Sequence, residues 1–194
     1  MKLWRLILRV LVGGLFIGHG TQKLFGWFGG HGIEGTGGFF ESLGLKPGRR
    51  NAIAAGTAEA GGGALLAAGL ATPLAGAAIG GTMITAIRHV HAPKGPWSTD
   101  GGWEYNAVLL AALFALLEEG PGPISLDHVL GTERCGLGWA VAALGAGAAG
   151  SYAASQLGQR EAQKADQAEF AGVPFQAAEQ ADVSAEQVGS PQTS

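Results

Sequence analysis

The sequence is poor in charge and in cysteine. Charged residues make up only 14% of the 194 residues, roughly half the share of about 25% that is usual in soluble domains. The net charge is −3, which argues against a basic nucleic-acid-binding protein. The single cysteine, Cys135, excludes an internal disulfide, a CxxC pair and a cysteine-based zinc site. A haem-binding CxxCH motif, a cysteine set for an iron–sulfur cluster and a flavin fingerprint are missing as well. A small membrane protein is the class that remains.

Long apolar segments are what the chain has instead. Each is close to the roughly 20 residues that a helix needs to cross about 30 Å of hydrocarbon. They lie at residues 3–20, 52–72, 74–90 and 103–117. Because proline can open a helix but cannot continue one, Thr72-Pro73 marks a tight hairpin between the second and third segments. The sequence therefore predicts an all-α fold in which residues 1–130 form an integral membrane four-helix bundle.

The C-terminal third differs from this bundle. Residues 131–154 contain a candidate fifth transmembrane helix, rich in alanine and glycine, which would otherwise pack on the bundle. Residues 155–194 hold six acidic and two basic residues and predict an acidic flexible tail that is partly helical or disordered. Gly14-x-x-x-Gly18 and Gly76-x-x-x-Gly80 have the spacing that lets helix backbones approach closely.

Polar side chains gather on one side of the predicted bundle. The first and third helices end on this side, and the second and fourth begin there. The candidate site residues on this side are His19, Gln22, Lys23, Glu59, Arg88, His89, Glu104 and Asn106. The opposite side has the turn at Thr72-Pro73, the N-terminus and the Glu118-Glu119 end of the fourth helix.

Glu59 is the most informative of these residues. A carboxylate inside a membrane helix costs free energy unless it is paired, protonated or hydrated, so it indicates function by default. Its alternative role is a structural ion pair with Lys23 or Arg88. His19 and His89 lie at helix ends, where a histidine can also simply reach the membrane interface. No metal site is predicted, because the histidines lack a ligand spacing such as HxxxH.

Several stretches, taken in order along the chain, resemble the DoxX family of small bacterial membrane proteins. The matching stretches are Gly18–Gly26, Gly35–Phe40 with Leu43-Gly44, Glu59–Gly62 with Gly69–Pro73, Met83–His91, Gly101–Asn106 and Gly120–Asp127. The resemblance implies a four-helix integral membrane fold in a bacterial plasma membrane. It covers about residues 5–130 and leaves out the C-terminal part.

The resemblance also implies redox work near the quinone pool, by analogy with thiosulfate-oxidising and thiol-stress relatives. The expected function is a membrane subunit of a quinone-linked oxidoreductase system, with quinone as electron acceptor and no covalently bound cofactor. Glu59, His89, Glu104 and His19 are the candidate catalytic residues. Lys23, Gln22, Arg88 and Asn106 are the candidate substrate-binding residues.

Two other functions stay open from the sequence. A non-catalytic membrane scaffold would use the acidic tail to recruit a soluble redox partner, and a small-solute permease would also need a membrane carboxylate. The expected partners are membrane lipid, a redox subunit and, as an open option, further copies of this chain, but no nucleic acid.

Overall fold

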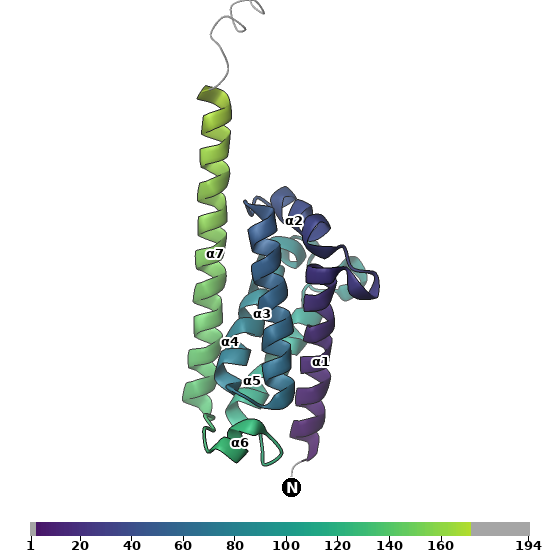
Figure 1. The fold of residues 1–194 in the computed structure, drawn as a ribbon, viewed down its shortest axis with the longest axis vertical. Helices are drawn as coiled ribbons and strands as arrows, with labels where there is room; N and C mark the ends of the chain where they lie inside the picture. The colour runs from purple at the N-terminus through teal and green to yellow at the C-terminus, as the bar shows by residue number, and fades with distance from the viewer. Residues whose placement is uncertain (1–2, 172–194) are drawn as a thin grey trace, which may run out of the picture.

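The computed structural model describes residues 3–171, and every regular element in this range is helical (Figure 1). The elements are α1 (Leu3–Phe25), η1 (Trp27–Gly29), α2 (Gly32–Ser42), α3 (Gly48–Ala68), α4 (Thr72–Ala86), η2 (Ile87–His91), η3 (Ala92–Lys94), η4 (Ser98–Asp100), α5 (Glu104–Glu119), α6 (Leu126–Leu130) and α7 (Leu137–Ala171). The predicted all-α fold is confirmed for this range. The helix α2 was not foreseen, because its glycine-rich sequence reads as a loop.

The long helices lie alongside one another, and two short helices cross the ends of the bundle. α6 lies at the end where the chain begins, and α2 lies across the opposite end (Figure 1). Phe16, Ile79, Leu113 and Leu116 are almost fully buried between the long helices. Van der Waals packing of such side chains, with glycines that let the helix backbones approach closely, holds the helices together.

Glycines let α1 and α3 pack with their backbones almost in contact. A methyl group at Gly13 would lie 2.5 Å from the carbonyl oxygen of Gly63, and one at Gly63 would lie 2.6 Å from that of Gly13. The predicted Gly14-x-x-x-Gly18 contact is wrong, because nothing lies within 4 Å of either position. The two glycines face outward because the packed stripe of α1 runs through its neighbour Gly13.

The glycines of α4 act differently from the prediction. Gly76 and Gly80 receive the side chains of Leu117 and Leu144, not another helix backbone. The close approach of α4 is made one residue later, at Gly81, where a methyl group would lie 3.0 Å from the carbonyl oxygen of Gly147 in α7. α7 is therefore an integral part of the bundle.

Two helices are long and apolar enough to cross a membrane: α1 and the Leu137–Lys164 part of α7. Only 28% and 22% of their most apolar windows are buried, so they are not the hidden core helices of a soluble protein. The other three predicted segments overlap α3, α4 and α5. α5 has 16 residues and is shorter than the length that spans a bilayer without help, whereas the 15 residues of α4 are continued by the five of η2.

α7 continues as a helix through residues 155–171, the first part of the predicted tail. This stretch carries α7 well beyond the other long helices, on the side of α2 (Figure 1). The rest of the predicted tail, residues 172–194, lies outside the described residues.

The end of the bundle near the N-terminus is closed by hydrogen bonds to the main chain. Asp127 accepts bonds from the Ala71 and Thr72 amides at 3.0 Å, from the Thr72 hydroxyl at 2.8 Å and from the Thr132 hydroxyl at 2.9 Å. Asp127 thus caps the start of α4, where Pro73 occupies the first turn as predicted. Burial alone would raise the pKa of Asp127, but these hydrogen bonds outweigh it and hold the pKa below its ordinary value.

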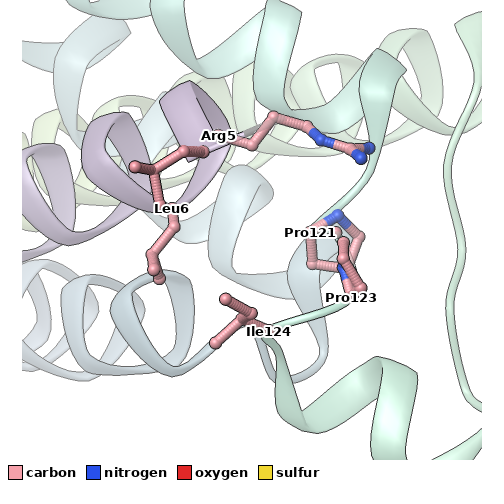
Figure 2. A pocket seen from close by; sticks show the side chains of 7 residues that line it. Arg5, Leu6, Pro121, Pro123 and Ile124 are labelled. Carbon is pink, nitrogen blue, oxygen red and sulfur yellow. The ribbon is translucent and has the colours of Figure 1, made fainter. Parts of the chain in front are cut away.

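Arg9 completes the closure of the same end. Its guanidinium is 2% exposed and donates to the carbonyl oxygens of Ala67, Pro121 and Ile124. Arg5, one turn earlier, faces the Pro121–Ile124 loop across a small pocket (Figure 2). This pocket has a volume of about 10 Å³, which leaves room for no more than about one water molecule.

Candidate functional site

A large cavity lies in the half of the bundle away from the N-terminus. Its volume is about 840 Å³, which is within the range of about 300–1,000 Å³ that is usual for small-molecule sites. Most of its wall consists of small or apolar side chains from α1, α3, α4, α5 and α7. Five of the predicted site residues line it: His19, Lys23, Glu59, His89 and Asn106. The polar side chains predicted to share one side of the bundle therefore largely meet at one cavity.

Glu59 and Lys23 form an ion pair on the cavity wall. Lys23 Nζ lies 2.6 Å from Glu59 Oε2, and the side chains are 26% and 5% exposed. Glu59 Oε1 makes no hydrogen bond within residues 3–171. Of the two candidate ion-pair partners of Glu59, Lys23 and Arg88, the structure pairs Glu59 with Lys23. The pair leaves one carboxylate oxygen available to a molecule in the cavity.

His19 is oriented by its neighbour Gln22. The His19 Nδ1 atom lies 3.1 Å from Gln22 Oε1, and the Gln22 amide nitrogen donates to the Phe28 carbonyl oxygen at 3.3 Å. Since the amide nitrogen of Gln22 is used in this way, its oxygen accepts from His19 Nδ1. Gln22 itself does not line the cavity. Gln22 therefore acts on the cavity only through its contact with His19.

The third predicted helix changes its winding where the site residues begin. α4 ends at Ala86, and η2 continues it as a π-helical turn, a feature that often occurs at functional sites. His89 faces the cavity and lies 2.9 Å from Ser155 Oγ through Nε2. Arg88 is exposed, and its guanidinium carbon lies 5.6 Å from the ring centre of Tyr152. The predicted role of Arg88 in substrate binding is thus not supported by its position.

Two predicted residues near the start of α5 differ in position. Asn106 is buried on the cavity wall, and its side-chain nitrogen lies 3.3 Å from Met83 Sδ. Glu104 does not line the cavity. Its Oε1 atom accepts a hydrogen bond of 2.7 Å from the Ser98 amide and so fixes the loop that contains η4. Glu104 therefore holds this loop and does not reach the cavity, and its catalytic role stays a prediction.

Several polar residues that were not among the predicted site residues also line the cavity. His91 lines it, and its Nδ1 lies 2.7 Å from the Gly101 carbonyl oxygen. Ser151 and Ser155 of α7 line it as well and are almost fully buried. These serines stand four residues apart in an alanine- and glycine-rich helix, a spacing that places both on one face. This signal was present, but the predicted boundary at residue 155 separated the two.

The described residues contain no group of three or more His, Cys, Asp or Glu side chains that could hold a metal ion. The polar groups of the cavity are instead suited to hydrogen bonding and proton transfer. These groups are the Lys23 ammonium, the Glu59 carboxylate with one unpaired oxygen, and histidine ring nitrogens, all beside an apolar cavity wall.

A comparison with protein families bears on the first half of the chain. Residues 4–92 match the DoxX family. The resemblance seen in the sequence is thereby confirmed for the segment from α1 to the beginning of η3. No match is found among curated proteins or solved structures. The DoxX segment contributes His19, Lys23, Glu59 and His89 to the cavity, whereas α5 and α7 lie outside the matched residues. The DoxX family is membrane-associated, and α1 and the Leu137–Lys164 part of α7 are long and apolar enough to span a membrane.

Proposed function

We propose that this protein is the membrane subunit of a quinone-linked oxidoreductase system that oxidises thiosulfate or thiols in a bacterial plasma membrane. In this proposal α3, α4 and α5 also cross the membrane, packed between the longer helices α1 and α7. The observation that carries the proposal is the cavity of about 840 Å³, in which an apolar wall adjoins the Lys23–Glu59 pair and three histidines.

The cavity matches the needs of a quinone in two respects. A quinone has an apolar body, which suits the alanines and glycines of the wall, and two carbonyl oxygens that need hydrogen-bond donors. Lys23 supplies a charged donor at the cavity surface, and charge-assisted hydrogen bonds are the stronger kind. Glu59 and the histidines provide groups that hold or transfer protons.

The reaction balances without a resident cofactor. Two thiols lose two electrons and two protons to form a disulfide, and one quinone takes up both to become a quinol. With thiosulfate, two anions lose two electrons to form tetrathionate, and the quinol takes its two protons from water through the cavity residues. Lys23 would also attract the thiosulfate anion.

The test is quinone reduction by the full chain in lipid nanodiscs, with thiosulfate or a small thiol as the electron donor. Glu59→Gln and His89→Ala should each lower turnover by at least about tenfold, the lower range for loss of an acid–base group. His128→Ala is the matched control, because His128 is exposed and pairs with Glu133 at 3.3 Å. It should retain turnover within about twofold of the original protein. A folded protein that reduces no quinone with either donor would overturn the proposal.

A second candidate function is a non-catalytic scaffold, favoured by the extension of α7 beyond the bundle (Figure 1). In that case the projecting helix would recruit a soluble redox partner, and the buried polar residues would be structural. Removing residues 160–194 should then abolish partner capture while quinone binding stays unchanged. Loss of quinone binding in the same truncation would contradict the scaffold function.

A further inference from the structure

α7 follows the DoxX segment in the chain but forms part of the cavity wall. Its lining residues are Ala146, Gly147, Gly150, Ser151, Ala154 and Ser155. Ser151 and Ser155 are 4% and 0% exposed. Each contacts a polar side chain of α4 or of its continuation η2: Thr85 Oγ1 lies 2.8 Å from Ser151 Oγ, and His89 Nε2 lies 2.9 Å from Ser155 Oγ. A cavity residue of the matched segment is thus held by a residue from outside it.

The hydrogen-bond partners of Ser155 determine which nitrogen of His89 carries the proton. A serine hydroxyl has one proton to donate, and Ser155 Oγ donates it to the Ser151 carbonyl oxygen at 2.9 Å. A carbonyl oxygen can only accept, so the remaining contact of Ser155 Oγ must be one in which it accepts. His89 Nε2 is therefore the donor, and the neutral ring carries its proton on Nε2.

The other ring nitrogen of His89 is left without a proton. His89 Nδ1 makes no hydrogen bond within residues 3–171, and the side chain lines the cavity. A bare imidazole nitrogen accepts a proton but cannot donate one. It can therefore accept the proton of a substrate that brings one, such as a thiol, whereas neither a quinone carbonyl nor thiosulfate brings a proton to accept.

We propose that Ser155 is a positioning residue that fixes His89 with its proton on Nε2, so that Nδ1 accepts the proton of a bound thiol. In this step the S–H bond breaks, an N–H bond forms on Nδ1, and a thiolate remains. Nδ1 passes this proton to the quinone and then accepts the proton of a second thiol, which follows the same route. The two thiolates form a disulfide as their two electrons pass to the quinone, which becomes a quinol. The use of a thiol rests on the proposed function, whereas the tautomer of His89 does not.

The tautomer can be measured directly by nitrogen-15 NMR of histidine-labelled full-length protein in nanodiscs, since a protonated and a bare ring nitrogen differ widely in chemical shift. His89 is assigned by comparison with His89→Ala. The original protein should show Nε2 protonated and Nδ1 bare. Ser155→Ala should give a mixture of tautomers, Ser155→Thr should restore the original pattern, and Ser151→Ala should leave it unchanged because Ser155 donates to a backbone oxygen.

Turnover supplies a second readout that a purely structural serine would not produce. Ser155→Ala should lower thiol-driven quinone reduction by roughly tenfold and thiosulfate-driven reduction by less than about twofold. An unchanged His89 spectrum in Ser155→Ala, or equal losses with both donors, would overturn the role of Ser155. A protein with the expected spectrum but no turnover would instead contradict the proposed function and leave the tautomer established.

Discussion

The two ends of the bundle use buried polar residues in opposite ways. At the end near the N-terminus, Arg9 donates to three backbone carbonyls, and Asp127 accepts four hydrogen bonds. At the other end, Glu59 and His89 each make one side-chain contact and keep one polar atom without a partner among residues 3–171. The pocket at the end near the N-terminus has a volume of about 10 Å³, whereas the cavity at the other end has a volume of about 840 Å³.

This comparison separates structural from functional polar residues better than burial does. Arg9, Asp127 and Glu59 are all less than 5% exposed, so their exposure does not distinguish them. They differ in how many of their polar atoms lack a hydrogen-bond partner. A buried group whose polar atoms all have hydrogen-bond partners holds loops in place, whereas a group with a free atom beside a cavity can bind something else.

The largest effect is expected from Arg9→Met. This change leaves three carbonyl oxygens without their charged donor, so the free energy of unfolding should fall by on the order of 3 kcal/mol. Arg5→Met is the matched control at the same end. Arg5 donates to the Glu119 carbonyl oxygen at 2.7 Å, and its Nε atom is buried without a partner among the described residues. Its loss should change stability by less than about 1 kcal/mol, as measured by reversible unfolding in detergent micelles. If Arg9→Met and Arg5→Met lowered the free energy of unfolding equally, the structural role assigned to the hydrogen bonds of Arg9 would be contradicted.

Asp127→Asn should cost about 2 kcal/mol at neutral pH, because the amide group presents hydrogens to donors that need an acceptor. The stability of the original protein should also depend on pH. The pKa of Asp127 is lower in the folded protein than in the unfolded chain. Its stabilisation is therefore complete above the unfolded value of about 3.9 and is lost as the pH falls through the lower folded value.

Unfolding experiments across the acid range check this dependence. Asp127→Asn should remove part of the fall in stability, since the amide does not titrate. Glu133→Gln is a control from the same region, because Glu133 is 40% exposed and pairs with His128. A pH dependence that is identical in the original protein and in Asp127→Asn would show that another carboxylate is responsible.

The smallest effect on stability is expected at the cavity. In Glu59→Gln the side-chain oxygen can still accept the hydrogen bond from Lys23, and Lys23 is partly exposed. The free energy of unfolding should therefore change by no more than about 1 kcal/mol. A loss as large as that of Arg9→Met would identify the Lys23–Glu59 pair as structural and weaken the proposed function.

The helical class and the DoxX resemblance could be predicted because each depends on local sequence. Apolar runs indicate helices, Thr72-Pro73 indicates a helix start, and a family motif is a string of residues. Even the convergence of His19, Lys23, Glu59 and His89 followed from counting helix directions. The turn of Arg88 away from the cavity could not be predicted in this way, since it depends on the π-helical winding of η2 and on Tyr152 of α7.

The sequence by itself therefore determined that this chain forms apolar helices whose polar residues gather on one side. Only the tertiary structure decided which of those residues share a cavity, that Gly13 and not Gly14 contacts α3, and that α7 completes the wall. The physical reason is that hydropathy and helix periodicity act over a few turns of one helix. The rotation of each helix and the choice of its neighbour depend instead on side chains far away in the sequence, as with Gly81 against Gly147 and His89 against Ser155.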